Sequence, residues 1–294
     1  MMTPSFKDHF SGIADRYVAF RPRYPDALFD YLAGAPRRRE LAWDCACGSG
    51  QATQALADRF ISVIATDASQ SQVAAAPSHP RIDYRVAPAE ESGLPSGSVD
   101  LVTVAQALHW FDIDRFYAEV RRVLVPGGLL AVWTYGVLHV EDREIDALVT
   151  RFYRVTLGPY WPPERELVEK EYRTLPFPFR ERRPPSFRME ALWSLPQLLG
   201  YFRSWSATSR YVAAHGDDPV SALADALSPL WGDPDCVREI PGLCSCGWER
   251  TERGQPEGMF DQDSGGGPLG RACPYPLGRP LAAGGVAFSV YRSG

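Results

Sequence analysis

The sequence has few cysteines, little excess charge and no long apolar run. Six cysteines among 294 residues are too few for a disulfide scaffold, and we expect reduced thiols. Two C-x-C pairs, Cys45/Cys47 and Cys244/Cys246, have neither a second ligand pair at zinc-finger spacing nor a nearby histidine pattern. We therefore interpret them as small packing residues rather than as a metal site.

Two kinds of partner are disfavoured by what is missing. A formal net charge of −5 gives no general attraction to phosphate backbones or anionic membranes. The N-terminal residues MMTPSFKDHF lack the apolar core of a signal peptide, and no apolar run approaches the roughly eighteen residues that span a bilayer. We expect a soluble, cytoplasmic protein with no nucleic-acid or membrane partner. The sequence does not indicate an oligomeric state.

Short apolar runs instead alternate regularly with longer helical patterns. Hydrophobic residues make up 45 % of the chain, which is ample for a sizeable core. Strands are predicted at residues 41–45, 62–67, 82–87, 99–106 and 129–135. Before the last of them, Phe116, Val120, Val123 and Leu124 recur at helical spacing until RRVLVPGG ends the helix. This alternation is typical of βαβ units in an α/β fold with a parallel sheet.

The pattern changes beyond residue 140. Helical stretches are predicted at 140–161, 162–175, 195–205 and 219–232, with an edge strand in the proline-rich run 175–194. From about residue 241 the sequence loses periodicity and is dense in Gly, Pro and Cys. We expect most of this last segment to be a disordered tail, in which only residues 286–292 have the pattern of a strand.

The run AWDCACGSGQAT, residues 42–53, is a short strand ending in an acid, followed by small residues with glycine at alternate positions. A dinucleotide fingerprint beginning at Gly48 requires a glycine where Thr53 stands, and a Walker loop requires a Gly-Lys-Ser/Thr sequence that is absent. Both phosphate-binding interpretations therefore fail. What remains is Asp44, a glycine-rich turn opening a helix, and a second acid, Asp67, at the end of the next strand.

These residues resemble the class I S-adenosylmethionine-dependent methyltransferases. The resemblance implies a Rossmann-like, doubly wound, mostly parallel seven-stranded sheet with a helical cap, and S-adenosyl-L-methionine as the cofactor. It also implies that Asp44 orders the loop, that Gly48 and Gly50 make room for the cofactor, and that Asp67 binds the ribose hydroxyls. Each acid also has a plain structural interpretation: Asp44 as a cap of the following turn, and Asp67 as the end of a strand.

Further cofactor contacts follow from the same resemblance. Ala68 would lie against the adenine, Ala89 with Glu90 at its edge, and Gln106 near the methionine part. Ala46 stands where the family has its first loop glycine. Because alanine tolerates a positive φ poorly, we expect strain if this position is left-handed.

Two segments resemble one particular branch of this family. FSGIADRYVAFRPRYP (10–25) and AQALHWFD (105–112) resemble the branch that contains trans-aconitate methyltransferase-like proteins. In that branch an N-terminal segment folds over the cofactor, so Tyr17 and Arg21 would be lid residues in the cofactor site, with Arg21 a partner for a carboxylate. Alternatively, the prolines of RPRYP only stiffen the entry to the first helix.

His109 and Trp110 follow the fourth predicted strand, where an open parallel sheet places its ligand crevice. Trp110 would face the sulfonium or shape the acceptor pocket, and His109 would orient or deprotonate the acceptor as the catalytic residue. The structural alternative makes Trp110 a core residue and His109 a hydrogen-bonded one. Tyr160, Trp161, Trp193 and Trp205 suggest a cap, although aromatic residues are more often core.

The expected organisation is a lid segment (1–36), a cofactor-binding core (37–140), a helical cap (141–240) and a tail (241–294). The predicted function is methyl transfer to a small-molecule acceptor, with a carboxylic acid as one candidate. The rival is an inactive cofactor-binding relative, because no apolar strand follows DPDCVREI where the family inserts its last strand. Either residues 286–292 supply that strand after a long insertion, or the sheet is incomplete; we hypothesise the latter. A dinucleotide-dependent oxidoreductase is disfavoured by Thr53.

Overall fold

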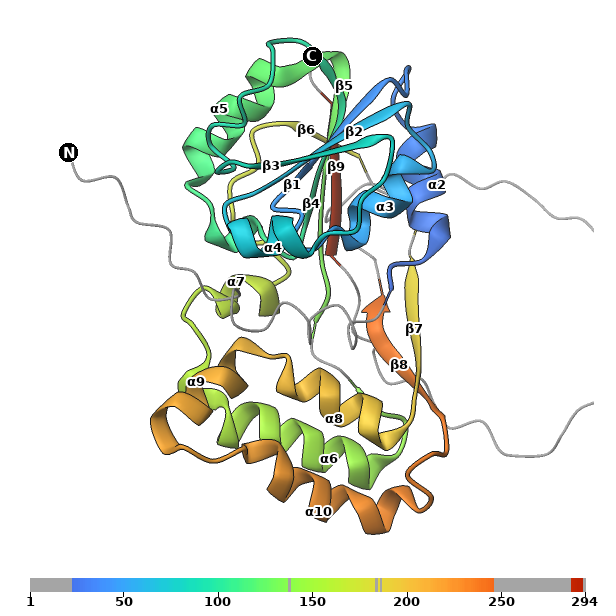
Figure 1. Cartoon of the computed structure of the whole chain (residues 1–294), viewed down its shortest axis with the longest axis vertical. Coiled ribbons are helices and arrows are strands. Elements are labelled where there is room, and N and C mark those ends of the chain that lie inside the picture. Colours follow the sequence, from blue (N-terminus) through green and yellow to red (C-terminus); the bar gives the residue numbers. More distant parts are fainter. Residues whose placement is uncertain (1–22, 137–138, 183–184, 186, 246–286, 293–294) are drawn as a thin grey trace, which may run out of the picture.

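The computed structural model describes residues 23–136, 139–182, 185, 187–245 and 287–292. Its centre is a sheet of five parallel strands, which confirms the predicted Rossmann-like, mostly parallel α/β fold (Figure 1). The strands are β1 (Leu41–Cys45), β2 (Ser62–Asp67), β3 (Ile82–Val86), β4 (Val99–Ala105) and β5 (Leu124–Thr134), in the order β3-β2-β1-β4-β5. The chain thus moves outward from β1 to β3 and then returns to the other side of β1.

Helices cover both faces of this sheet, which explains why the strands are nearly continuous apolar runs. On one face, α2 (Asp26–Gly34) and α3 (Gln51–Ala57) pack over inward side chains such as Leu101 and Trp133. On the other face, α5 (Ile113–Val123) packs over side chains such as Trp43 and Val102. Figure 1 shows these helices on opposite sides, and α4 (Gln70–Ala75) at the strands' carboxyl ends.

Strand β5 begins five residues earlier than the sequence predicts. The helix ends at Val123, so Leu124, which the sequence pattern includes in the helix, and the Pro-Gly-Gly run both belong to the strand. A Cβ atom on Gly128 would lie 3.0 Å from Leu124 Cδ2 and 3.1 Å from the carbonyl oxygen of Val99. The glycine therefore lets β5 run tightly along β4 from its start.

The hypothesis that the sheet lacks its last strand is wrong. Strand β9 (Ala287–Arg292) pairs antiparallel with β5, with Leu129 opposite Arg292 and Thr134 opposite Ala287. Strand β6 (Arg180–Arg182), the predicted edge strand, pairs antiparallel with the far side of β9. The alternating residues near the end of the chain therefore satisfy the backbone groups along β5 that an incomplete sheet would leave exposed.

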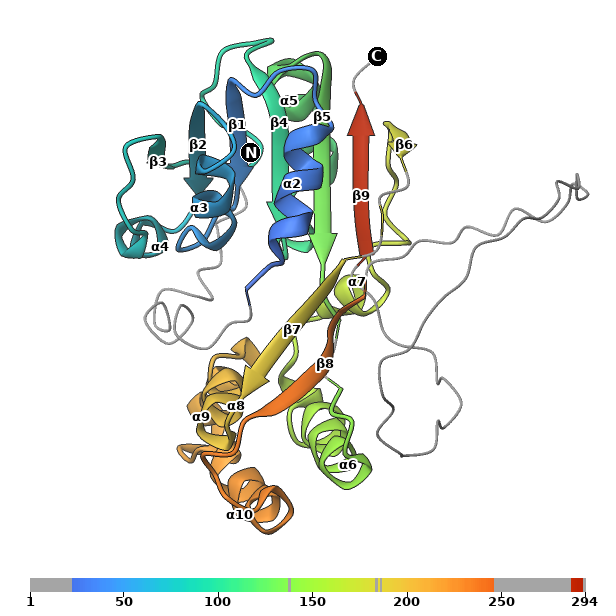
Figure 2. The same ribbon diagram turned by 90° about the vertical axis from the view of Figure 1, so that its right-hand side faces the viewer.

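The predicted boundary at residue 240 also lies inside an element. Strand β8 (Arg238–Ser245) pairs antiparallel with β7 (Arg188–Trp193) in a separate two-stranded ribbon. Residues 241–245 and 287–292 of the expected tail are thus in strands, and residues 246–286 lie outside the described residues. In Figure 2 the ribbon runs from the sheet to the cap.

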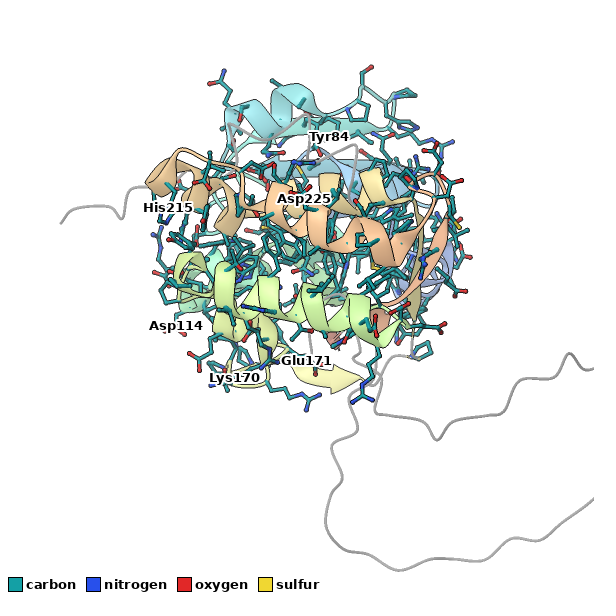
Figure 3. All side chains as sticks on the ribbon, turned by 90° about the horizontal axis from the view of Figure 1, so that it is seen from below. Tyr84, Asp114, Lys170, Glu171, His215 and Asp225 are labelled. Atoms are coloured by element: carbon teal, nitrogen blue, oxygen red, sulfur yellow. The ribbon has the colours of Figure 1, made fainter. Side chains whose placement is uncertain are left out.

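The cap consists of short helical elements on the side of the sheet where its parallel strands end (Figures 1 and 2). They are α6 (Arg143–Arg151), a π-helical turn η2 (Phe152–Thr156), a 3-10 turn η3 (Gly158–Tyr160), α7 (Arg165–Glu169), α8 (Leu195–Arg203), α9 (Ser206–His215) and α10 (Pro219–Trp231). All but α9 lie in stretches predicted to be helical. Aromatic rings fill the cap interior, with Trp205 only 4.9 Å from Phe202 between ring centroids. Figure 3 shows this filled interior from below, with Lys170 and Glu171 on the periphery.

Candidate functional site

The candidate site lies where the carboxyl ends of the parallel strands meet. Strands β1, β2 and β3 are in parallel register, and β4 is in parallel register with the opposite side of β1. The connections leaving β1 and β4 therefore diverge, which makes a crevice at this topological switch point. The predicted residues Asp44, Asp67 and Gln106 lie at or just before this edge.

The loop from β1 to α3 requires left-handed backbone at three positions. Ala46, Gly48 and Gly50 have φ values of 55°, 56° and 87°, and Gly50 caps the N-terminus of α3. A Cβ atom on Gly50 would overlap the hydroxyl oxygen of Tyr84 from β3. The glycine pattern is thus explained by backbone conformation and by the close approach of Tyr84.

Ala46 is strained, as the sequence predicts for a left-handed alanine. Its φ of 55° places Cβ close to a carbonyl oxygen, which costs roughly 1–2 kcal/mol relative to right-handed backbone. Neighbouring contacts hold the loop in this form, since the amide of Cys47 donates to Thr66 O at 3.0 Å and that of Gly50 to Cys47 O at 3.0 Å. Strain that persists in this way is common at ligand sites.

Asp44 joins the loop helix to the neighbouring strand. The side chain is buried, and its Oδ2 accepts from Thr53 Oγ1 at 2.6 Å while Oδ1 accepts from Thr103 Oγ1 at 2.8 Å. Burial raises the pKa of Asp44 to about 6, against the two threonine hydrogen bonds that lower it. Asp44 therefore orders α3 against β4 through side chains and does not simply cap the next turn.

Asp67 fixes the glycine loop from the end of β2. Its Oδ2 accepts a hydrogen bond from the Gly48 amide at 2.8 Å, and Oδ1 accepts one from the Ser69 amide at 2.8 Å. Asp67 does more than end a strand, because it joins the loops after β1 and β2.

The residues after β2 and β3 lie along the same edge. Ala68 is half-buried between Asp67 and Ser69, and Ala89 is buried. Glu90 Oε1 accepts from the backbone amide of Asp112 at 2.8 Å, which ties the loop after β3 to the start of α5.

Gln106 turns sharply out of β4 with a φ of 57°. Its side-chain amide donates to Tyr135 O at 3.1 Å, and its Oε1 accepts from Thr134 Oγ1 at 2.8 Å. Thr134 is the last residue of β5, and Tyr135 follows it directly. The carboxamide is therefore fixed in one orientation between the sheet and the pocket described next.

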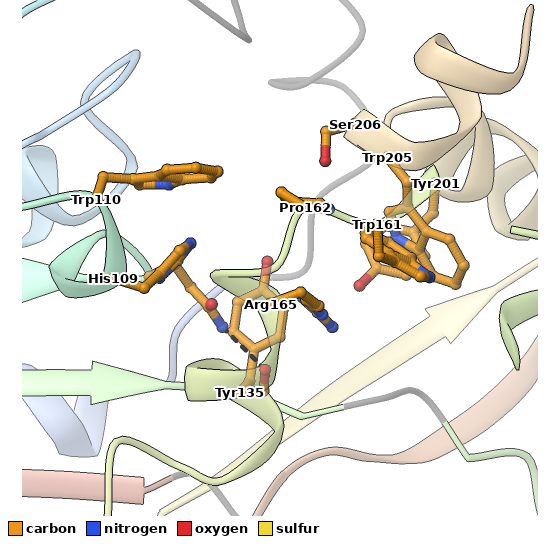
Figure 4. A pocket seen from close by; sticks show the side chains of 10 residues that line it. His109, Trp110, Tyr135, Trp161, Pro162, Arg165, Tyr201, Trp205 and Ser206 are labelled. Atoms are coloured by element: carbon orange, nitrogen blue, oxygen red, sulfur yellow. Dashed lines mark hydrogen bonds between the residues drawn. The ribbon is translucent and has the colours of Figure 1, made fainter. Parts of the chain in front are cut away.

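A pocket of about 60 Å³ lies between this edge and the cap (Figure 4). Its walls come from the turn after β4, the end of β5, the segment around α7, and the α8–α9 junction. The lining residues are Gln106, His109, Trp110, Tyr135, Trp161, Pro162, Arg165, Tyr201, Trp205 and Ser206. Five of these ten side chains are tryptophan or tyrosine, and Gln106, His109, Arg165 and Ser206 add polar groups, so the pocket is rich in both aromatic and polar groups.

His109 and Trp110 belong to a 3-10 turn, η1 (Leu108–Trp110), and both line the pocket as the sequence predicts. His109 Nδ1 lies 2.8 Å from Tyr172 Oη. Burial, and after it the positive charge of Arg165, lowers the pKa of His109 to about 3. The imidazole is therefore neutral at physiological pH and a weak base.

Sequence reasoning missed Arg165, along with Tyr135, Pro162, Tyr201 and Ser206. The guanidinium of Arg165 lies 4.8 Å from the centre of the Trp161 ring and 5.6 Å from that of Tyr153, and its Nε donates to Tyr153 Oη at 2.9 Å. No carboxylate within the described part of the chain forms an ion pair with it. The run WPPER, an arginine just after an aromatic residue and two prolines, was the available signal, but only the fold brings it opposite His109.

Two predicted residues, Tyr17 and Arg21, lie outside the described residues. Among the residues that are described, no group of three or more His, Cys, Asp or Glu side chains is arranged to hold a metal ion. In the same part of the chain, no helix has the length and apolar character needed to cross a membrane.

Comparisons with known proteins agree with this geometry. Residues 43–132, which run from β1 into β5, match a family model described as a methyltransferase domain. A Dictyostelium discoideum protein that carries a methyltransferase name is 37 % identical over 238 residues, which cover 79 % of this chain and 90 % of the relative. An uncharacterized methyltransferase of Mycobacterium tuberculosis is 39 % identical over 182 residues, 60 % of this chain and 70 % of its own length.

A solved structure is also similar over most of the chain. It is described as a type II methyltransferase from Anaeromyxobacter dehalogenans, with 48 % sequence identity and a TM-score of 0.70. The match covers 76 % of this chain and 94 % of that one.

Proposed function

This chain belongs to the S-adenosylmethionine-dependent methyltransferases, and from that premise we propose that it methylates a small-molecule carboxylic acid bound between the sheet and the cap. The observation that carries the proposal is Arg165, a guanidinium that lines a pocket in which half of the lining side chains are tryptophan or tyrosine. Arginine recognises carboxylates through paired N–H donors. The proposal extends the resemblance of residues 10–25 and 105–112 to the trans-aconitate methyltransferase-like branch.

The residues after β1 and β2 suit the cofactor. We assign the ribose hydroxyls to Asp67, whose carboxylate lies at the end of β2 and is hydrogen-bonded to the amides of the loops after β1 and β2. We assign the close approach of the amino-acid part to the left-handed loop of Ala46, Gly48 and Gly50, in which the missing Cβ of Gly50 makes room for Tyr84. Asp44 would hold this loop in place through Thr53 and Thr103.

The remaining cofactor contacts follow the strand order. Ala68 would lie against the adenine, and Ala89 and Glu90 at its edge, because β3 is next to β2. Gln106 would lie near the methionine part, since it leaves β4 on the other side of β1 and also lines the pocket. The pocket would therefore open toward the reacting end of the cofactor.

S-adenosylmethionine supplies, when bound, an electrophilic methyl group on a positively charged sulfur. The chain's own residues have to align the acceptor at about 3 to 3.5 Å and exclude water. Trp110, Trp161 and Trp205 form apolar walls suited to excluding water. Arg165 would hold the acceptor by its charge, and a carboxylate is already nucleophilic, so no base has to remove a proton from it.

An inactive relative with an incomplete sheet is not favoured. Its motivation was the missing strand beside β5, and β9 pairs there over six residue positions. A cytoplasmic location remains part of the proposal.

The test is calorimetric titration of the full chain with S-adenosylmethionine and with its demethylated product, followed by an assay of small carboxylic acids for methyl ester formation. We expect Asp67→Ala to abolish cofactor binding. Asp83→Ala, an exposed acid on the neighbouring strand paired with Arg85, serves as the matched control and should bind normally. Cofactor binding accompanied by methylation of hydroxyl or amine acceptors, but of no carboxylate, would contradict the proposed acceptor class.

A further inference from the structure

Tyr172 lies just beyond α7 on unusual backbone. Glu171 and Tyr172 have φ values of 53° and 58°, two consecutive left-handed residues of which neither is glycine. Each costs roughly 1–2 kcal/mol relative to right-handed backbone, yet the turn is held by the Tyr172 amide, which donates to Leu167 O at 2.8 Å. The strained turn buries the Tyr172 ring and carries its hydroxyl to His109.

The two rings are fixed relative to each other. Tyr172 Oη lies 2.8 Å from His109 Nδ1, and the ring planes are 27° apart with centroids separated by 6.0 Å. Trp110 packs on His109 with a centroid separation of 4.6 Å. Because Nδ1 is engaged with Tyr172, Nε2 is the ring nitrogen left to face the pocket that His109 lines (Figure 4).

The proton between the two side chains can be assigned by counting donors and acceptors. The hydroxyl of Tyr172 is buried and lies within hydrogen-bond distance of His109 Nδ1, and a buried O–H donor left without an acceptor would be costly. Burial raises the pKa of Tyr172 well above its ordinary value, so the hydroxyl keeps its proton. That proton needs an acceptor, and Nδ1 of a neutral imidazole at 2.8 Å provides one.

Thr134 is the competing acceptor for the same proton. It interacts with Tyr172 and gives its own proton to Gln106 Oε1 at 2.8 Å. If Tyr172 donated to Thr134, Nδ1 would have to carry the imidazole proton. The hydrogen bond found for the Tyr172 hydroxyl joins it to His109 Nδ1, whereas the bond found for the Thr134 hydroxyl goes to Gln106, and this favours His109 as the acceptor.

We propose that Tyr172 is a positioning residue that holds His109 as a neutral imidazole with its proton on Nε2, so that the site receives acceptors already ionised in solution. The part of this inference that concerns the acceptor rests on the proposed function. The assignment of the His109 tautomer does not depend on it. The polar groups on this side of the pocket would then be donors, the Nε2–H of His109 and the guanidinium of Arg165. Two converging donors bind an anion and do not remove a proton.

The chemical balance agrees with such an acceptor. A carboxylate oxygen forms the new bond to the methyl carbon with its own electron pair. The carbon–sulfur bond breaks, and its electron pair remains on sulfur as a neutral thioether. No proton is released, so the reaction needs no base, and a donor at Nε2 only orients the acceptor.

The tautomer can be measured without any ligand by nitrogen-15 NMR of the imidazoles in the labelled full chain. The chain has five histidines, and the His109 signals are identified by their loss in His109→Gln. We expect a protonated Nε2, an unprotonated Nδ1 and no titration between pH 5 and 8. Tyr172→Phe should give a mixture of tautomers or a titrating ring.

Tyr117→Phe is the matched control for removal of a buried hydroxyl. Tyr117 is buried, and its hydroxyl has no hydrogen-bond partner among the residues that the structure describes. Its substitution should leave the His109 signals unchanged. A protonated Nδ1 in the unmodified protein, or a His109 ring that titrates between pH 5 and 8, would overturn the proposal.

A second experiment separates this inference from the proposed function. The glutamine amide of His109→Gln can supply a donor close to the Nε2 position, so this variant should retain at least tenfold more kcat/KM than His109→Ala for any carboxylate that is methylated. A general base would make the two variants equally inactive. If the NMR result is as expected but no carboxylate is methylated, the proposed acceptor class fails and the tautomer assignment stands.

Discussion

The backbone amide of Gly48 donates a hydrogen bond of 2.8 Å to Oδ2 of Asp67. This bond joins the loop after β1 to the end of β2. The loop is therefore preorganised by the carboxylate that we assign to the ribose. Preorganisation lowers the ordering cost of binding, and substitutions in this loop should act on stability and cofactor affinity together.

Replacing Ala46 by glycine should stabilise the protein. Its φ of 55° is accessible to glycine without a steric penalty, although glycine also loses more conformational freedom on folding. We expect a net gain of about 0.5–1 kcal/mol in the free energy of unfolding, measured by urea denaturation. Ala52→Gly, inside α3, is the control and should destabilise by a similar amount. A loss of stability in Ala46→Gly would show that the left-handed alanine is not strained.

Replacing Gly50 by alanine should have the opposite effect. A Cβ atom there meets the Tyr84 hydroxyl and lies 3.2 Å from Tyr84 Cζ, on backbone with a φ of 87°. We expect a loss of about 2 kcal/mol or more in stability, with weaker cofactor binding measured by calorimetry. The double variant Gly50→Ala/Tyr84→Phe should recover part of the loss because the overlapping oxygen is gone. Equal stability of the single and double variants would mean that backbone conformation alone is responsible.

Sequence reasoning located the glycine-rich loop to which we assign the cofactor, because the signals of that loop are local. Asp44, Gly48, Gly50 and Asp67 stand at strand ends, and an ordered parallel sheet brings such ends together. The acceptor pocket could not be located in this way, since Arg165 and Tyr172 reach His109 from a segment more than fifty residues away. Their positions depend on cap packing and on a strained turn, which no short motif encodes.

The end of the sheet was misjudged for a similar reason. The pattern in residues 286–292 predicted a strand, but more than forty residues separate it from the last strand before it, β8. The free-energy cost of closing a loop rises only slowly with the length of the loop. The long separation was therefore weak evidence against pairing. The apolar edge of β5 was the stronger determinant.

Asp44 should make stability depend on pH in an unusual direction. Its pKa is raised from 3.8 to about 6 by burial, so between these values the folded state binds more protons than the unfolded state. Stability attributable to this group therefore falls as pH rises from about 4 to 6 and is constant above that range. Asp44→Asn should remove this slope in denaturation curves compared across that range. A difference between the two proteins that is independent of pH would contradict the raised pKa.

Arg165 should determine which acceptors are used and not whether the cofactor binds. Removing its charge in Arg165→Gln should raise KM for a methylated carboxylate by at least tenfold, because a hydrogen bond to a charged group contributes about 1.5–3 kcal/mol. Cofactor affinity, measured by calorimetry, should stay within about twofold. Arg121→Gln is the matched control, since Arg121 also stacks on an aromatic ring, 5.0 Å from the centre of Phe179, but does not line the pocket. Arg165→Lys should retain an intermediate KM, because a point charge replaces a planar pair of donors. A KM unchanged in Arg165→Gln would place the acceptor's carboxylate elsewhere and remove the observation on which the acceptor class depends.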